Sequence, residues 1–230
     1  MNEIITVGAR VKYAFETTAG VRPTSGYVTL DNVTEAPEIA LSLETIDVSN
    51  ITDKITRYVE GRQDPGGEKQ FTVNHSDAGI AEWNTLVALA ETKKASGLRC
   101  WWEYRYPNST NSFFFCGTPK QIGNSGITGN SASTITGSVV FEELGGWQPH
   151  SAEITPSATS TSVTAGSTGS VTLTNSVGNV KITASNPAVA TATESSGTVT
   201  ITGVKAGTSI LTIEDGNHDA CKVVVEVTAA

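Results

Sequence analysis

The chain has 230 residues, of which 38% are apolar and 17% charged, so it is globular and long enough for one large or two ordinary domains. Its net charge of −8 argues against a general nucleic-acid binder, because such proteins need a basic surface to displace counterions from phosphate. No stretch reaches the roughly 18 apolar residues of a membrane span, and we expect synthesis and assembly in the cytoplasm.

The three cysteines, Cys100, Cys116 and Cys221, are too few and too widely spaced for the disulfide framework of a small secreted domain. Cys100 and Cys116 could lie on adjacent strands. The pattern favours two buried, reduced thiols there and leaves their pairing open.

The first half of the chain is predicted to alternate strands with turns. Residues 6–15 form a plausible opening strand. Residues 38–46 alternate with a period of two, which indicates a strand with one apolar face. The apolar face carries Ile39, Leu41 and Leu43, and the opposite face carries Ala40, Ser42 and Glu44.

Residues 46–73 are the most informative stretch. A strand runs into a long excursion that returns through Asp64, Pro65 and two glycines into a short strand at 71–73. Long irregular loops between strands are uncommon and are usually functional or disordered. This one is too apolar for disorder by composition, so it is predicted to become ordered against something else. Its apolar residues are Ile51, Ile55, Tyr58 and Val59.

One helix is predicted after this excursion. Ser76 or Asp77 can cap its start, and lysines and Gly97 mark its end. Apolar residues recur at helical spacing and predict one buried stripe. The stripe consists of Ile80, Trp83, Leu86, Val87 and Ala90.

Residues 98–106 and 112–116 flank a Pro-Asn turn and are predicted to form a β-hairpin, and residues 133–143 alternate again as a strand. Neighbouring residues on a strand point to opposite faces. Trp101 and Trp102 therefore predict that both faces of the hairpin are apolar, one of them covered by the helix or by a neighbouring subunit.

Composition changes sharply near residues 145–150, which contain Gly-Gly and Pro. No aromatic residue follows Trp147. We therefore divide the chain into a domain at 1–147, a linker at 148–152 and a domain at 153–230. The second domain has short, regularly spaced strands, which predict a β-sandwich with a core of Val, Ile, Leu and Ala.

Four passages of the first domain, taken in order, resemble the tail tube proteins of long-tailed bacteriophages. They are residues 44–49, residues 58–72, the helix with Trp83, and residues 115–119 followed by the strand at 135–141. The resemblance implies a β-sandwich or barrel with one helix and a long inter-strand loop. It also implies that six copies close into a ring and that rings stack into a tube in the virion tail.

The same resemblance implies roles for particular residues. An inter-ring assembly loop would contain Ile51, Ile55, Tyr58, Val59, Gly61 and Asp64. Polar faces of two strands are candidates for the lumen through which DNA is ejected without specific binding: Glu38, Ser42, Glu44, Thr134, Thr136, Ser138 and Glu142. The partners implied are further copies of the chain and other tail proteins, such as a tape measure and a terminator.

Residues 153–230 resemble bacterial immunoglobulin-like domains of group 2. The match lies in Ser185-Asn186-Pro187-Ala188-Val189-Ala190-Thr191 and in the later hairpin at 196–210. Ala184 stands where the family pattern carries Trp, so binding that depends on that aromatic ring is not expected. Such domains occur in adhesins and as decorations on phage structural proteins.

The whole chain is thus expected to be mainly β: an α+β first domain, then an immunoglobulin-like β-sandwich. Its three histidines and its Gly-rich segment at 123–129 match no catalytic or phosphate-binding motif, so no enzyme activity, metal or cofactor is expected. The leading hypothesis is a self-assembling tail tube protein whose second domain decorates the exterior. The alternative is a surface adhesion module that binds host glycan through residues 153–230.

Overall fold

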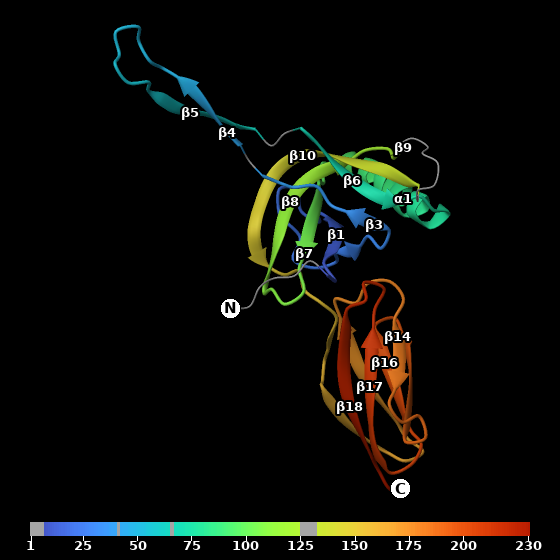
Figure 1. Ribbon diagram of the computed structural model, residues 1–230. Helices are drawn as coiled ribbons and strands as arrows, with labels where there is room; N and C mark the ends of the chain where they lie inside the picture. The colour runs from blue at the N-terminus through green and yellow to red at the C-terminus, as the bar shows by residue number, and fades with distance from the viewer. Residues whose placement is uncertain (1–6, 41, 65–66, 125–132) are drawn as a thin grey trace. The chain divides into compact units, whose positions relative to one another are not determined.

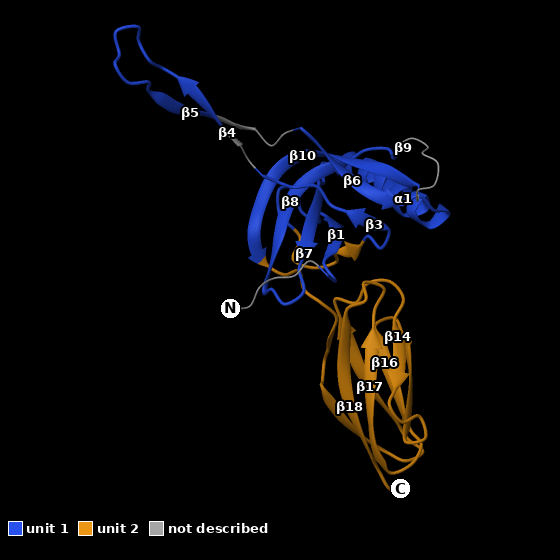
Figure 2. Ribbon diagram, viewed as in Figure 1, with its two compact units in different colours: residues 1–22, 30–148 blue, residues 23–29, 149–230 orange. Residues whose placement is uncertain are grey.

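The computed structural model describes residues 7–40, 42–64, 67–124 and 133–230 and is mainly β (Figure 1). The chain forms two compact units. Unit 1 comprises residues 1–22 and 30–148, and unit 2 comprises residues 23–29 and 149–230 (Figure 2). No helix in the described residues is both long and apolar enough to cross a membrane.

Unit 1 is built on a curled antiparallel sheet in which the strands follow the order β1-β7-β8-β10-β6-β3, with β9 paired to β10. The strands are β1 (Arg10–Phe15), β3 (Val33–Glu35), β6 (Glu68–Asn74), β7 (Cys100–Arg105), β8 (Asn111–Pro119), β9 (Gly123–Asn124) and β10 (Thr134–Pro149). The predicted hairpin is confirmed as β7 and β8, with Trp102 opposite Phe115.

Two strand predictions differ from the structure. The strand expected at 38–46 begins only at Ser42, because the described residues 36–40 are irregular. Strand β10 does not stop at residue 143: it continues through Gly145 and Gly146 to Pro149, across residues that composition assigned to a domain boundary. Gly145 fits inside the sheet because it has no side chain, since a Cβ there would lie 2.8 Å from both Phe114 Cβ and the Trp101 ring.

The predicted helix is confirmed as α1 (Asp77–Lys94). Its first turn is capped by Ser76, whose hydroxyl accepts a hydrogen bond from the N–H of Gly79 at 3.0 Å. Trp83 is buried against β10 at Gly137, where any side chain would collide with the indole ring. Its Nε1 donates to the carbonyl of Lys120 at 2.8 Å, so the ring is both packed and hydrogen-bonded.

The core beneath α1 is aromatic. The Trp102 indole is fully buried; it stacks on Phe71 at 5.0 Å and on Phe115 at 5.9 Å between ring centroids. Its Nε1 donates to the carbonyl of Gly117 at 2.9 Å. Trp83 lies 6.1 Å away from it, so one indole from the helix and one from the sheet share the same core.

The opposite face of β7 and β8 is covered by the chain itself, not by the helix. Glu16 is 1% exposed and accepts hydrogen bonds from Trp101 Nε1 and from Arg99 Nε, both at 3.0 Å. Arg22 lies over the ring of Phe114 at 4.1 Å. The neighbouring subunit that the sequence left open as a cover is therefore not needed on this face.

Unit 2 is a β-sandwich of two four-stranded sheets, ordered β11-β13-β16-β15 and β12-β18-β17-β14. The strands are β11 (Thr155–Pro156), β12 (Ser160–Thr164), β13 (Thr168–Thr174), β14 (Lys181–Ala184), β15 (Ala190–Ser195), β16 (Thr198–Gly203), β17 (Gly207–Glu214) and β18 (Ala220–Thr228). Strands β12 and β18 pair in parallel, and the other pairs are antiparallel. The core between the sheets is aliphatic, as predicted, and includes Val171, Ile201, Leu211 and Val225.

Unit 2 also takes residues 23–29, which composition assigned to the first domain. This segment contains β2 (Val28–Thr29). Asn217, in the turn between β17 and β18, accepts a hydrogen bond from the N–H of Thr29 at 2.8 Å and donates to the carbonyl of Tyr27 at 2.5 Å. Asp215 orders the same turn by accepting from the N–H groups of Val177 and Asn217. The polar turn is thus a binding site for the chain's own early segment.

The carboxylate of Glu16 links stability to pH. Burial alone would raise its pKa, but hydrogen bonds from Trp101, Gly20 and Arg99 outweigh burial and lower it. A lowered folded-state pKa stabilises the fold above the unfolded value of about 4.3 and loses that contribution as the pH falls through the folded value. We therefore expect Glu16→Gln to destabilise unit 1 at pH 7 and to differ progressively less from wild type below pH 4.

Urea unfolding followed by tryptophan fluorescence at pH 3 to 7 measures this, because every Trp lies in unit 1. Glu91→Gln, at an exposed position of α1, is the control. A destabilisation by Glu16→Gln that does not change with pH would contradict the assignment.

Removing the Asn217 side chain should loosen residues 23–29 from unit 2. Asn217→Ala leaves the N–H of Thr29 and the carbonyl of Tyr27 without this partner, which costs about 1–3 kcal/mol. We expect a lower melting temperature and faster hydrogen exchange at residues 27–29. Asn179→Ala, at an exposed position of unit 2, should change neither.

Candidate functional site

The segment predicted to be a long irregular loop is largely a β-hairpin. Strands β4 (Ser42–Asp47) and β5 (Tyr58–Asp64) pair antiparallel as a two-stranded sheet of their own, with Ile46 opposite Val59 and Asp47 opposite Tyr58 (Figure 1). Most of β4 lies in the strand predicted at 38–46, but the prediction of an irregular loop was wrong over β5. After Tyr58 and Val59 this strand is wholly polar apart from Gly61, so it shows no alternation of apolar and polar residues. Of the turn predicted to return the chain, residues 65 and 66 lie outside the described residues.

A β-bulge lies at the base of the hairpin. Leu43 is opposite Gln63 and Thr45 is opposite Glu60, so Glu44 faces two residues of β5, Gly61 and residue 62. A Cβ on Gly61 would lie 2.9 Å from the carbonyl oxygen of Glu44. Gly61, predicted as an assembly-loop residue, therefore has a structural role, because its missing side chain allows the two arms to approach at the bulge.

The tip of the hairpin, residues 48–57, is ordered by its own polar groups. The N–H of Val48 donates to the carbonyl of Arg57 at 2.9 Å, and the N–H of Arg57 donates to Oγ of Ser49 at 2.8 Å. Asp53 accepts from the N–H of Asn50 at 2.9 Å and pairs with Arg57 at 3.2 Å. Hydrogen bonds from Ser49 also lower the pKa of Asp47. The tip is thus ordered by polar contacts between its own residues.

The apolar side chains of the hairpin, in contrast, are uncovered. Ile51 is 104% exposed and Ile55 is 79% exposed. Tyr58 is 62% exposed, Val59 and Ile46 are both 48% exposed, and Val48 is 42% exposed. A loop that is ordered by internal polar contacts while its aliphatic groups face water has the organisation of a preformed docking element. The four predicted apolar residues all belong to this exposed set, and Asp64 ends β5.

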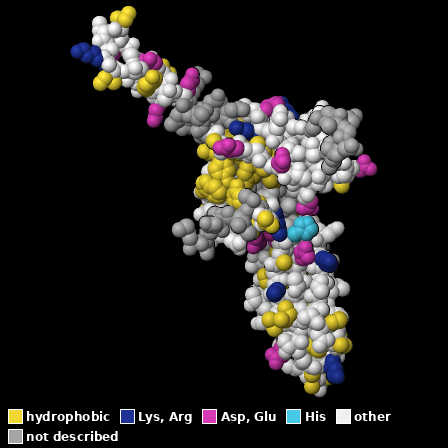
Figure 3. All heavy atoms as spheres, viewed as in Figure 1, with side chains coloured by type: hydrophobic (Ala, Val, Ile, Leu, Met, Phe, Trp, Pro, Cys, Tyr) yellow, Lys and Arg dark blue, Asp and Glu magenta, His cyan; other side chains and the backbone are white. Residues whose placement is uncertain are grey.

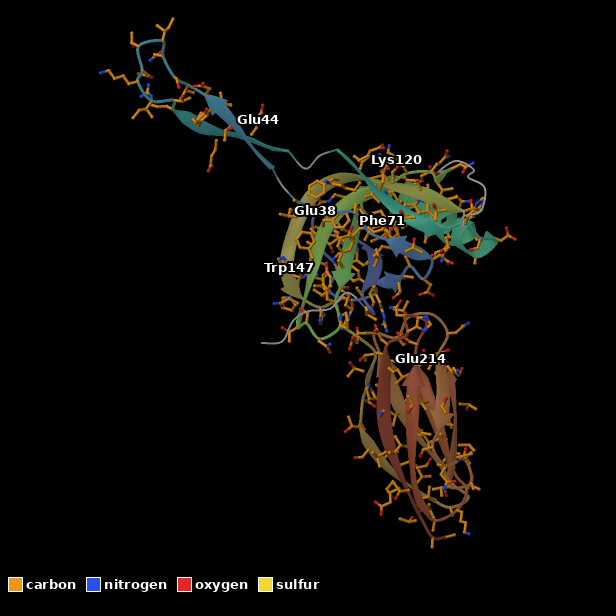
Figure 4. All side chains as sticks on the ribbon, in the orientation of Figure 1. Glu38, Glu44, Phe71, Lys120, Trp147 and Glu214 are labelled. Atoms are coloured by element: carbon orange, nitrogen blue, oxygen red, sulfur yellow. The ribbon has the colours of Figure 1, made fainter. Side chains whose placement is uncertain are left out.

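The lumen candidates lie in separate parts of the chain. Figure 4 labels Glu44 on the β4–β5 ribbon and Glu38 in the irregular segment before it; both are exposed. Ser42 begins β4, and nothing is described of its side chain. Thr134, Thr136, Ser138 and Glu142 lie on β10, the first three half-buried. Glu142 accepts a hydrogen bond from Thr118, so it is partly engaged inside unit 1.

The cysteines of unit 1 are buried thiols whose deprotonation is disfavoured. All three are free thiols, and Cys100 and Cys116 are buried. Burial raises the pKa of Cys100 well above its ordinary value and also raises that of Cys116, with the nearby Glu142 carboxylate adding to the second shift. The interpretation as buried, reduced thiols agrees with these contacts.

Comparisons with known proteins give no family. No family model matches the chain, and no curated protein matches it. Among solved structures, domains 4 and 5 of the S-layer protein SbsC match with 18% identity and a TM-score of 0.33, over 95% of this chain and 98% of that one. The baseplate of the anti-feeding prophage matches with 7% identity and a TM-score of 0.32, over 61% and 90%. At such TM-scores neither likeness carries an argument.

The bulge at Gly61 gives a direct test of the hairpin. Gly61→Ala puts a methyl group against the Glu44 carbonyl, so the arms must separate locally. We expect amide protection to fall several-fold at residues 44–48 and 58–61, with the rest of unit 1 unchanged in hydrogen-exchange mass spectrometry. Gly123→Ala is the matched control, because its added Cβ would have only an ordinary 3.6 Å contact. Unchanged protection at the hairpin would show that the bulge does not need glycine.

Proposed function

We propose that this chain is a structural virion protein that assembles into stacked rings forming a phage tail tube, the conduit for DNA ejection. The main observation in support is the β4–β5 hairpin. Polar groups of its tip hydrogen-bond to one another, while its aliphatic side chains are exposed to solvent. The tail tube resemblance of residues 1–147 supplies the architecture, with six copies in each ring.

The hairpin surface has the right energetic scale for repeated weak contacts. Fully burying a large aliphatic side chain is worth about 1.5–3 kcal/mol, so the two most exposed groups of the tip, Ile51 and Ile55, contribute about 3–6 kcal/mol together. Association costs about 4–15 kcal/mol. The net free energy of association through a single docked hairpin is then close to zero or unfavourable. Several hairpins engaged together between two rings share one association cost, so their combined contact is favourable. Stable assembly follows from repetition of the contact around the ring.

The charge of the chain suits passage of DNA. The net charge is −8, and an acidic bore repels phosphate, so transit would not have to break salt bridges. In a ring, each carboxylate on the inner wall is repeated once per subunit. The partners in this role are other copies of the chain and the remaining tail proteins, and the protein resides in the virion tail.

We assign unit 2 to the exterior of the tube as a decoration. The adhesion alternative would require a ligand-binding surface there, and the aromatic rings that commonly stack on sugars are absent after Trp147. The exposed aliphatics of unit 2 are Val204, Ile210 and Val224. A protein that stays monomeric and binds host glycan would favour the alternative over the tube.

The proposal predicts that assembly depends on the hairpin tip. Ile51→Ser combined with Ile55→Ser removes two of the most exposed aliphatic groups without touching the tip's hydrogen bonds. We expect loss of tubes in negative-stain electron microscopy and a rise of about a hundredfold or more in the concentration needed for assembly. Circular dichroism should remain that of wild type.

The matched control is Val204→Ser combined with Ile210→Ser, which removes two exposed aliphatic groups from unit 2. Tubes of normal length from the tip variant, or equal loss of tubes from the control, would refute hairpin-driven assembly.

A further inference from the structure

The aromatic face of the unit 1 sheet extends beyond the helix that covers it. Beneath α1 this face is fully buried at Phe71, Trp102 and Phe115. From there the rings continue: Phe115 contacts Tyr104 at 5.4 Å, and Tyr104 contacts Phe113 at 6.4 Å. Figure 3 shows hydrophobic side chains gathered on the surface of unit 1 over β8 and β10.

The row ends in a cluster formed by Tyr106, Phe113 and Trp147, called here the aromatic patch. Trp147 lies 5.7 Å from Tyr106 and 5.4 Å from Phe113 between ring centroids. Trp147 is 58% exposed, and the other two rings are half-buried. An exposed tryptophan held in place by two further aromatic rings is an interaction surface of the type found at interface centres.

The backbone of β10 is shaped to put Trp147 on this face. Gly145 lies against Trp101 and Phe114, which are on the opposite face of the sheet. Residues two apart on a regular strand point to the same side, so Trp147 would share the face of Gly145. Gly146, between them, has a φ of 71°, in the left-handed region that favours glycine. This irregularity turns Trp147 to the side of Phe113.

The same chain carries a surface that can cover the patch. The hairpin tip offers Ile51 and Ile55 as uncovered aliphatic groups, and these pack well on aromatic rings. The two surfaces differ, so a contact between two copies is head-to-tail and leaves one tip and one patch free for further copies. Strands β4 and β5, of six and seven residues, extend over roughly 20 Å, and the tip lies beyond them.

We propose that the aromatic patch of one copy is the docking site for the β4–β5 tip of a second copy. This inference rests on the proposed function, because it identifies the receptor for the hairpin in assembly. Apolar packing supplies the affinity, and Trp147 is the central contact.

The test uses two variants that each lack one half of the contact. The tip variant carries Ile51→Ser and Ile55→Ser, and the patch variant carries Trp147→Ser. Val7→Ser, at an 80% exposed position of unit 1, is the control for the patch variant. Light scattering coupled to size exclusion measures the mass of each protein alone and of an equimolar mixture.

We expect each variant alone to have the mass of the same small particle, a monomer or a single ring, and not to assemble further. The control should assemble like wild type. In the mixture, the intact tips of the patch variant meet the intact patches of the tip variant. The limiting mass should double and grow no further, because the remaining tips and patches are inactive.

The outcomes separate the two proposals. Assembly of the tip variant alone would overturn hairpin-driven assembly itself. Assembly of the patch variant alone, or two arrested variants whose mixture does not double in mass, would overturn the patch as receptor and leave the hairpin's role standing. A wild-type protein that stays monomeric, with its tip and Trp147 both protected from hydrogen exchange or quenching, would overturn docking between copies and show that the hairpin covers the patch of its own chain.

Discussion

Unit 1 depends on burying two indole rings from opposite directions in one core. Trp102 comes from the sheet and Trp83 from the helix, and each Nε1 finds a carbonyl partner, so neither ring leaves a polar group unsatisfied. Gly137 is required because the Trp83 ring occupies the space of its missing side chain. Helix, sheet and strand order are therefore fixed together by the same few contacts.

That core also explains why part of the sheet remains open. One helix of 18 residues covers the central strands, but the aromatic row continues past it to Trp147. The opposite face needs no such cover, because Glu16, Arg99 and Arg22 close it with hydrogen bonds and a cation–π contact. Among the described residues of unit 1, exposed large apolar side chains gather on the hairpin, and Trp147 exposes one more at the end of this aromatic row.

The hairpin and the patch share a physical design. In both, rigidity comes from contacts within the chain: hydrogen bonds at the tip, and ring contacts with a glycine irregularity at the patch. Preorganised surfaces lose little conformational entropy on binding, so most of the apolar burial is available for association. In the assembly proposed above, a head-to-tail contact between these unlike surfaces would propagate from copy to copy.

The amino-acid sequence predicted the mainly β class, the limits of α1 and most strands of unit 2, because hydrophobic periodicity and capping residues are local signals. It also singled out Ile51, Ile55, Tyr58 and Val59 as apolar residues without an obvious place in a core. Three features could be recognised only once the chain was folded: the pairing of β4 with β5, the position of Gly145 and Gly146 within β10, and the attachment of residues 23–29 to unit 2 through Asn217. These features depend on partners distant in sequence, and no local pattern specifies which distant residue will supply the missing hydrogen bond or fill the space that a glycine leaves.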